Sequence, residues 1–546
     1  MKTKIINTMN LCGLCLLCTL SVSCSDDNYG PDPSRDWAGT TTSFTSNDEK
    51  GFSTYYNPAI GRCGDPMPFY DQKAKEFKVL YLQEYDNNGA CYHPFWGIST
   101  KDGAHYQSLG EVLPTGTSTQ EADASLGTGC AVYNEEDKLY YIYYTGHNVL
   151  LKNVEVVMRA TSPDFKTWTK DYTWMLRGAD YGYSTVDFRD PQVFKAEDGL
   201  WHMVIVSNLK FAEFKSSDLK TWEHVGQFPM IWDRMLECPD IFQMGDYWYL
   251  VYSEGYRAAW SRKVKYMMAT SWEALKACFN DPGANWPQDG KEGILDSRAF
   301  YAGKTASDGT DRYIWGWCPY RTGATNDDKN VNVGADSEPN WAGALVCHKV
   351  VQHADGTLTL GEVPAIKSKY NQAQTVSVMA SNGYDNGTLS GDSAYVLYNR
   401  LGTHNHISLT VTTSNNWDKF GISLVRSTDP EYYYTMIINP ENENWRKVNF
   451  EQEGYRIEQV INQKGEIENR KVYGKGFIAG IDGYGFARPA DNVYKIDIYT
   501  DNSVMVMYIN DNVCYTNRIY GIQKNCWSVN NYGGSITVSD VKVSQY

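Results

Sequence analysis

Positive charge is scarce in this sequence. Its 50 Lys and Arg residues are outnumbered by 65 Asp and Glu residues, which gives a formal net charge of −15 at pH 7. The basic residues form no tract. Nucleic acids and anionic membrane surfaces attract proteins through clustered lysine and arginine side chains. The charge therefore argues against both as partners and is compatible with a neutral ligand.

Paired cysteine spacings are missing from most of the chain. Of the 13 cysteines, three lie in the N-terminal apolar run, one follows it as Cys24, and the other nine are scattered without a C-x-x-C spacing. An odd, scattered set argues against a zinc site and against a fully paired disulfide framework. We expect most of these nine cysteines to be buried free thiols and at most one or two disulfides to form among them. The Asp pairs lack the alternating ligand spacing of a calcium loop, so no metal is predicted.

The N-terminal apolar run, Leu11–Val22, is too short to span a bilayer but suits the hydrophobic region of a signal peptide. Small residues end the run just before Cys24, and Ser25-Asp26-Asp27 follow. This resembles a bacterial lipoprotein signal, residues 1–23, with Cys24 as the lipidated first residue and the surface-export signal of Bacteroides-type lipoproteins after it. We expect a secreted protein anchored to the outer membrane by lipid alone, at the cell surface or on the periplasmic face. A plain secretory signal cleaved elsewhere is the alternative.

Sustained helical periodicity is nearly absent and is confined to a short piece near residues 271–278. Aromatic residues are abundant instead: they make up 14% of the chain, with 41 Tyr and 17 Trp. Aromatic side chains favour half-buried, pleated surfaces, so the composition favours an all-β protein. A chain of 546 residues exceeds what one hydrophobic core usually serves, so two folded domains are expected.

Five segments repeat one pattern, in which a turn, a short apolar strand, a polar turn and an aromatic strand follow one another. The first strands start near Asp65, Cys130, Asp190, Cys238 and Ala299, and their partners near Val79, Tyr140, Trp201, Tyr247 and Tyr313. A repeat of roughly 45 to 65 residues suits a four-stranded blade, so the pattern predicts a five-bladed β-propeller. An irregular β-sandwich is the alternative.

The propeller is expected over residues 49–363, after a polar tether formed by residues 24–48. In residues 364–546, a connector leads to short strands that alternate with turns rich in Gly, Asn and Asp. Regular short strands of this kind predict a C-terminal β-sandwich.

Three acids occupy equivalent places in the repeat. Asp65, Asp190 and Glu237 stand at the start of the first strand of blades one, three and four. Because the first strand of each propeller blade lines the central channel, these acids should converge on one pocket. Crowded carboxylates have pKa values that are pushed apart, and such pairs cleave glycosidic bonds. Taken singly, each acid could equally be a turn residue, since Asp-Pro pairs are common in turns.

The residues around the acids resemble glycoside hydrolase family 32, which includes invertases, inulinases and levanases. Phe188-Arg189-Asp190-Pro191 matches the R-D-P motif of that family, and Glu237-Cys238-Pro239-Asp240 matches its E-C-P motif. Gly64-Asp65-Pro66 falls where the family carries N-D-P. Shorter matches follow in family order, at Phe95-Trp96-Gly97, Gly127-Thr128-Gly129, Phe300-Tyr301-Ala302, Trp315-Gly316-Trp317 and Trp341-Ala342-Gly343.

The resemblance implies roles for these residues. Asp65 would be the nucleophile, Glu237 the general acid/base and Asp190 the stabiliser of the transition state, while Arg189 would hold a substrate hydroxyl. The fructosyl subsite would be lined by Gln83, Trp96, Thr128, Asp296 and Trp317. The resemblance implies an oligo- or polysaccharide substrate and no metal or organic cofactor, and it leaves the oligomeric state open.

The first motif departs from the family pattern, W-M-N-D-P-N-G. Here it reads Arg62-Cys63-Gly64-Asp65-Pro66-Met67-Pro68, so Gly64 replaces the asparagine before the nucleophile. Without the asparagine side chain a buried hydrogen bond to the sugar could be lost, which would weaken sugar binding by about 1–3 kcal/mol. Three hypotheses follow: a retaining β-fructosidase, a propeller hydrolase of another glycan such as arabinan or xylan, and a surface glycan-binding protein without turnover.

Overall fold

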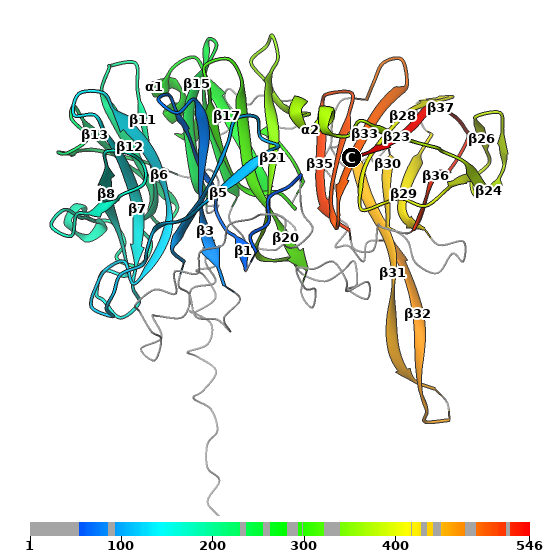
Figure 1. Ribbon diagram of the computed structural model, residues 1–546, viewed down its shortest axis with the longest axis horizontal. Helices are drawn as coiled ribbons and strands as arrows, with labels where there is room; N and C mark the ends of the chain where they lie inside the picture. The colour runs from blue at the N-terminus through cyan, green and yellow to red at the C-terminus, as the bar shows by residue number, and fades with distance from the viewer. Residues whose placement is uncertain are drawn as a thin grey trace, which may run out of the picture.

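The computed structural model describes residues 54–59, 61–85, 93–229, 236–254, 263–280, 293–297, 299–321, 339–415, 418–426, 434–439, 449–462, 464–475, 488–519 and 525–546. The predicted signal peptide, the tether and Cys24 lie outside these residues. In the described part of the chain, no helix is both long and apolar enough to cross a membrane. Figure 1 shows two β-rich lobes side by side, which confirms the predicted all-β fold of a propeller followed by a sandwich.

The first lobe is a five-bladed propeller of antiparallel sheets. Blade one consists of β2 (Met67–Asp71), β3 (Glu76–Glu84), β4 (Phe95–Thr100) and β5 (Tyr106–Leu113), and blade two of β6 (Ser125–Asn134), β7 (Leu139–His147), β8 (Glu155–Ser162), β9 (Thr169–Lys170) and β10 (Leu176–Arg177). Blade three consists of β11 (Arg189–Lys195), β12 (Trp201–Val206), β13 (Lys210–Ser216) and β14 (Glu223–Pro229), preceded by the short helix η1 (Gly178–Tyr181). Blade four consists of β15 (Leu236–Met244), β16 (Tyr247–Glu254), β17 (Lys263–Ala269) and β18 (Gly293–Ile294), with α1 (Trp272–Asn280) before β18. Blade five consists of β19 (Tyr301–Ser307), β20 (Arg312–Arg321), β21 (Pro339–Gln352) and β22 (Leu358–Gly361).

The first strands of the blades form the inner ring of the propeller. Neighbouring contacts run from β2 to β6, β11, β15, β19 and back to β2. Each inner strand pairs with the aromatic strand that follows it, as the repeat predicted. The ring therefore brings residues from five distant segments around one axis.

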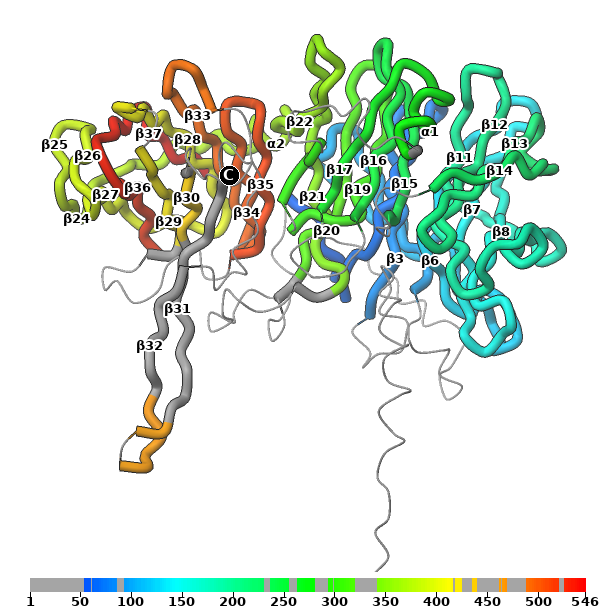
Figure 2. The backbone as a smooth tube through the Cα atoms, turned by 180° about the vertical axis from the view of Figure 1, so that it is seen from behind, coloured from blue at the N-terminus to red at the C-terminus, as the bar shows by residue number. Residues whose placement is uncertain are grey.

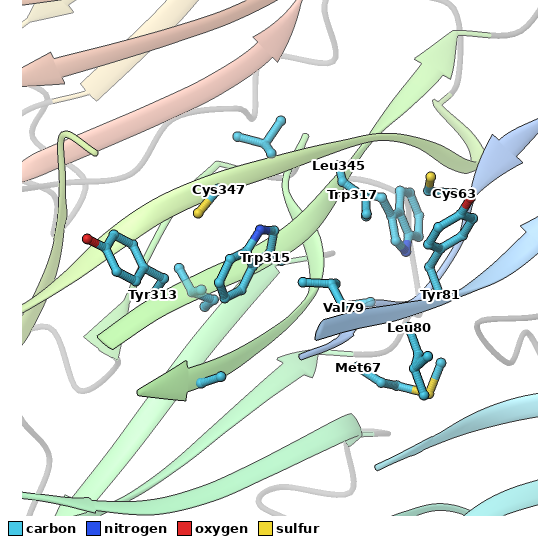
Figure 3. Packing of buried hydrophobic residues seen from close by; sticks show 14 of the residues in the cluster. Cys63, Met67, Val79, Leu80, Tyr81, Tyr313, Trp315, Trp317, Leu345 and Cys347 are labelled. Atoms are coloured by element: carbon cyan, nitrogen blue, oxygen red, sulfur yellow. The ribbon is translucent and has the colours of Figure 1, made fainter. Parts of the chain in front are cut away.

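A short strand, β1 (Arg62–Cys63), joins the first and last blades. Cys63 lies opposite Gly343 of β21 on one side and opposite Gln83 of β3 on the other. The core beneath this junction is aromatic, and Figure 3 shows Trp317 of β20 beside Tyr81 of β3, with Trp315 further along β20. This packing fixes the chain segment that leads directly into Asp65.

The second lobe is a sandwich of two antiparallel sheets, entered through α2 (Pro364–Lys369). One sheet has the order β25 (Tyr384–Asp385), β26 (Thr388–Ser390), β37 (Ser535–Gln545), β28 (His404–Thr413), β33 (Val493–Asp501), β34 (Val504–Ile509) and β35 (Val513–Arg518), with β23 (Gln372–Gln374) on β37. The other has the order β24 (Val378–Asn382), β27 (Tyr395–Tyr398), β36 (Cys526–Asn531), β29 (Phe420–Arg426), β30 (Tyr434–Asn439), β31 (Asn449–Ile461) and β32 (Ile467–Lys475). Burial alternates along β28, where Ile407, Leu409 and Val411 face the core, as period-2 patterning requires.

The sandwich lies beside blade five, as Figure 2 shows from behind, and β35 contacts β20 and β22. Tyr508 and Cys514 of the sandwich belong to the same hydrophobic cluster as the propeller core. The buried Arg518 of β35 donates hydrogen bonds of 2.9 Å to the carbonyl oxygens of Cys318 and Pro319 in β20. Polar and apolar contacts thus hold the sandwich against the propeller.

Eight cysteines outside the N-terminal region are described, and all are buried free thiols: Cys63, Cys130, Cys238, Cys278, Cys318, Cys347, Cys514 and Cys526. Cys91 lies outside the described residues. The expectation of mostly buried thiols is confirmed for these eight, which form no disulfide with one another.

Candidate active site

Three buried carboxylates come together at one end of the inner ring. Asp65 lies just before β2, Asp190 is the second residue of β11 and Glu237 is the second residue of β15. Each is at most 2% exposed. Cys238, the neighbour of Glu237, joins the other two: its backbone N–H donates to Asp190 Oδ2 at 2.9 Å, and its thiol lies 3.7 Å from Asp65 Oδ2. The blades therefore bring the acids together as predicted.

β-Bulges aim these side chains. The pairing of β11 with β12 slips between Arg189 and Gln192, and that of β15 with β16 slips just after Glu237. Within these bulges Asp190 has φ 56° and Cys238 has φ 51°. Positive φ is uncommon for residues other than glycine and costs on the order of 1–3 kcal/mol. Bulges redirect side chains beside active sites, and here they turn acids of two blades toward one point.

Besides the Cys238 thiol, Asp65 has a hydrogen-bond donor at each of its carboxylate oxygens. Thr128 Oγ1 donates to Oδ2 at 2.6 Å, and Trp317 Nε1 donates to Oδ1 at 2.9 Å. Burial raises the pKa of Asp65 above its usual value, the two hydrogen bonds work against that shift, and the charge of Glu237 adds to it. The two donors come from blades two and five, so they fix the carboxylate in one orientation.

Asp190 has a strongly shifted titration. Burial is the largest cause and raises the pKa of Asp190 to about 7. The charge of Arg189 and the hydrogen bond from the Cys238 N–H oppose this shift, and the charges of Glu237 and Asp65 add to it. Its own backbone N–H donates to Thr145 Oγ1 at 3.0 Å. An acid with this pKa changes charge near neutral pH.

Glu237 is bound through both of its oxygens. Arg189 Nη2 donates to Oε1 at 3.1 Å, and the Tyr301 hydroxyl lies 2.8 Å from Oε2. The same hydroxyl lies 3.1 Å from the carbonyl oxygen of Glu254. A hydroxyl has one proton to donate, whereas a carbonyl oxygen can only accept. Tyr301 can therefore donate to an ionised Glu237, or accept from a protonated Glu237 while donating to the carbonyl of Glu254.

Arg189 is the cation at the centre of this acidic site. It pairs with Glu237, with Glu155 at 3.5 Å and with Asp187. Burial alone would lower the pKa of Arg189, but the charges of Asp187, Glu155 and Glu237 outweigh it and raise that pKa well above its usual value. The guanidinium is thus permanently charged and holds Glu237 in place.

Gln83 and Trp96 were expected to line the same subsite, and both lie in blade one. Gln83 of β3 is buried opposite Cys63, two residues before Asp65. Trp96 of β4 is buried opposite Tyr81 in the neighbouring strand. Thr128 and Trp317, by contrast, contact Asp65 directly through the hydrogen bonds described above. Four of the five subsite residues thus belong to blades that meet at the acids.

Gly64, which departs from the family motif, is packed against an indole. A Cβ atom placed on Gly64 would lie 2.5 Å from Cζ2 and Cη2 of Trp341. The indole of Trp341 lies 6.5 Å from that of Trp317 and 4.6 Å from the His93 ring, measured between ring centroids. Trp341 therefore occupies the space in which the usual asparagine side chain would begin.

Asp296 was also expected to line the sugar subsite, and its described partners include Thr516, His348 and Cys514. Asp296 is fully buried at the interface between the lobes. Its carboxylate accepts hydrogen bonds from the N–H and hydroxyl of Thr516 in β35, at 2.7 and 2.5 Å, and lies 3.2 Å from His348 Nε2. The Cys514 thiol lies 3.4 Å away. With its oxygens committed to these partners, Asp296 joins the sandwich to the propeller.

Two contributors were missed by reasoning from the sequence. Tyr301 begins β19 at the place that Arg189 takes in β11, so its position in the repeat was an available signal. Cys238 was recognised as part of a motif, but its connecting role depends on the bulge that turns its N–H toward Asp190. That bulge has no signature in the sequence.

Both lobes match family descriptions. Residues 56–362 match the Glycosyl hydrolases family 32 N-terminal domain, and residues 356–543 match the GH32, BT1760-like, C-terminal domain. The levanbiose-producing levanase of Bacillus subtilis is 27% identical over 195 residues, which are 33% of this chain and 35% of that protein. The chain thus spans only about a third of that relative. The raffinose invertase of Escherichia coli is 26% identical over 451 residues, 78% of this chain and 80% of that protein.

Solved structures share the architecture. The Bombyx mori GH32 beta-fructofuranosidase BmSUC1 superposes with a TM-score of 0.61 at 18% identity, covering 91% of this chain and 94% of that one. The exo-inulinase from Aspergillus awamori superposes with a TM-score of 0.64 at 16% identity, covering 91% and 98%. At such identities the likeness shows the fold. The family 32 N-terminal match alone spans more than half of the chain, and this protein therefore belongs to glycoside hydrolase family 32.

Proposed function

We propose that this protein is a retaining glycoside hydrolase that cleaves β-fructosyl linkages in fructans or sucrose-type sugars. One observation carries the proposal: Cys238, which follows Glu237, contacts both Asp65 and Asp190, so the three motif acids share one buried site. Paired carboxylates of this kind are the chemical requirement for glycoside hydrolysis.

In the first step, Asp65 attacks the anomeric carbon of the fructosyl unit. The carbon–oxygen bond to the leaving group breaks, and Glu237 gives its proton to the departing oxygen. Thr128 and Trp317 hold the attacking carboxylate in one orientation, which lowers the entropic cost of attack. Tyr301 suits the proton donor because its hydroxyl can accept from a protonated Glu237.

In the second step, the ionised Glu237 takes a proton from a water molecule, which attacks the same carbon and releases Asp65. Each displacement inverts the carbon, so two together retain its configuration. Asp190 would bind ring hydroxyls and stabilise the positive charge that develops in both transition states. Its pKa of about 7 lets it accept or donate a hydrogen bond near neutral pH.

The choice of fructans rests on relatives. The levanase of Bacillus subtilis, the raffinose invertase of Escherichia coli and the exo-inulinase of Aspergillus awamori all carry names of fructose-containing substrates. A neutral sugar also suits a chain with a formal charge of −15. No residue of the described site requires a metal or an organic cofactor for these steps.

A second candidate is hydrolysis of a different glycan, such as an arabinan or xylan. The contact between Gly64 and Trp341 favours it, because an indole replaces an amide beside the nucleophile. A glycan-binding protein without turnover is less well supported, since binding alone would not require donors aligned on both oxygens of Asp65.

We further propose export and lipid anchoring through Cys24, with the enzyme exposed on the outer membrane. The apolar run before Cys24 and the acids after it support this proposal. Metabolic labelling with a radioactive fatty acid should mark the wild-type protein and not the Cys24→Ala variant. Label in both would contradict the proposal.

The enzymatic proposal is tested by product analysis on levan, inulin, sucrose and arabinan, with wild type beside Glu237→Gln. Fructose or fructo-oligosaccharides released only by wild type would support it. Release from arabinan alone would favour the second candidate, and binding without release by both proteins would favour the binding protein.

A further inference from the structure

A pocket opens toward the other end of the inner ring from the three acids. Its volume is about 260 Å³, and its lining includes Phe69, Gln192, Asp240, Phe242 and Arg312. Gln192 follows Asp190 by two residues in β11, and Asp240 follows Glu237 by three in β15. Across each bulge the partner strand advances only two residues, from Val206 to Val204 and from Ser253 to Val251. At about 3.3 Å per residue, Gln192 and Asp240 lie up to roughly 7 Å further along the channel, and none of the three acids lines the pocket. The pocket is therefore separate from the three acids.

The arginine of this pocket has unused donors. Arg312 Nη1 donates to Thr305 Oγ1 at 2.7 Å, and its guanidinium carbon lies 3.8 Å from the centre of the Phe242 ring. Among the residues that the structure describes, no carboxylate forms an ion pair with it. A guanidinium carries five N–H groups in a planar fork, so several of them remain available to a ligand over the pocket.

Acceptors stand next to these donors. Gln192 Nε2 donates to Asp240 Oδ1 at 3.3 Å, while the buried Gln192 Oε1 accepts no hydrogen bond within the described chain. Asp240 Oδ2 is already committed to the N–H and hydroxyl of Thr305. A buried acceptor without a partner is destabilising, and a hydrogen bond from a ligand hydroxyl would remove that cost.

The free donors of Arg312 and the free acceptor of Gln192 together indicate the chemistry of the ligand. An anion without a proton, such as chloride or sulfate, could accept from Arg312 but has none to give Gln192, whereas a protonated phosphate could do both and is therefore included in the test. A sugar ring carries hydroxyls that both donate and accept, and the partly buried rings of Phe69 and Tyr70 offer it an apolar wall. The volume lies below the range of about 300–1,000 Å³ that drug-sized ligands occupy, so it suits one ring.

We propose that this distal pocket is a second saccharide-binding site, which holds one sugar unit of a glycan without cleaving it. Phe69, Gln192 and Arg312 would make the contacts. The site stands on its own residues, and only the choice of fructose as the probe rests on the proposed function.

The test is equilibrium dialysis of radiolabelled fructose against the full chain carrying Glu237→Gln, with inorganic phosphate as a competitor in a parallel series. We expect two fructose molecules per chain. Arg312→Met and Gln192→Met should each reduce this to one, whereas Arg177→Met, at an exposed arginine of blade two, should leave it at two. In the background with Glu237 intact, both pocket variants should hydrolyse substrate at the wild-type rate.

One fructose per chain that persists in Arg312→Met and Gln192→Met would overturn the second site and leave the proposed function standing. Displacement of the second fructose by phosphate would also overturn it, in favour of an anion site. Loss of hydrolysis in well-folded pocket variants would show that the pocket serves the active site instead. Because two variants probe the same pocket, a folding failure of one leaves the other as the test.

Discussion

The indole of Trp341 stands where a side chain at position 64 would begin. A Cβ atom on Gly64 would lie 2.5 Å from two carbons of that ring, closer than van der Waals contact permits. Position 64 directly precedes Asp65, so the space beside the nucleophile holds the indole of Trp341 instead of an asparagine amide. Glycine and tryptophan at these two positions therefore form a matched pair.

Gly64→Asn should lower kcat/KM by about 100-fold, because the new side chain displaces Trp341 and with it the backbone that carries Asp65. Trp341→Ala alone should be less damaging. In the double variant the asparagine has room, so its kcat/KM should exceed that of Gly64→Asn. Equal or lower activity in the double variant would show that the two positions act independently.

Thr128→Val should lower kcat and move the acidic limb of the pH profile to higher pH. The Thr128 hydroxyl stabilises the ionised Asp65, so its loss lets burial raise the Asp65 pKa further. The ionised, attacking form of Asp65 is then populated only at higher pH. The pH profile of kcat/KM reports the pKa of Asp65 in the free enzyme, so its acidic limb should move accordingly. A fall in kcat of about tenfold is expected.

The control for this experiment is Thr435→Val, at a buried threonine of the sandwich that shares a hydrogen bond with Ser423. It removes the same atoms away from the acids and should leave the pH profile unchanged. An acidic limb that stays in place in Thr128→Val would contradict the assignment of Asp65 as the ionised nucleophile.

Asp190→Asn should abolish activity yet raise thermal stability at pH 8. In the folded protein the carboxyl group of Asp190 has a pKa of about 7, whereas an aspartate in the unfolded chain has a pKa of about 3.9. Between these values the folded state holds more protons, so the contribution of Asp190 to stability falls as pH rises. Asparagine removes this penalty, and the gain in Tm should vanish below about pH 4. A gain that is independent of pH would contradict the account.

Asp296→Ala should destabilise the protein by about 3 kcal/mol or more without changing KM. The substitution leaves the buried partners Thr516 and His348 without their acceptor. Denaturant unfolding and initial rates on the same preparation measure the two effects. Asp180→Ala, at an exposed position in η1, should change neither. A large rise in KM with unchanged stability would place Asp296 in the sugar subsite.

The repeat predicted the propeller because each blade shows the same local chemistry, a buried strand that turns into an aromatic one. Asp65, Asp190 and Glu237 could be placed together because they share one phase in that repeat. Thr128 and Trp317 came from the family resemblance, and their contacts with Asp65 agree with it.

Other features depended on distances that no local pattern encodes. Asp296 precedes the inner strand of blade five, and its contacts with Thr516 depend on the docking of β35 from the sandwich. Trp341 lies in β21, and its place beside Gly64 follows from the pairing of β1 between blades five and one. Both depend on how distant sheets close on each other.

The most direct test of the central claim is to trap the covalent intermediate. Glu237→Gln should be incubated with a fructoside whose leaving group needs no proton, digested and examined by mass spectrometry. The account predicts one fructosyl unit on the peptide that contains Asp65, and none when Asp65→Asn is added. A fructosyl unit on Asp190, or hydrolysis with inversion of configuration, would contradict it.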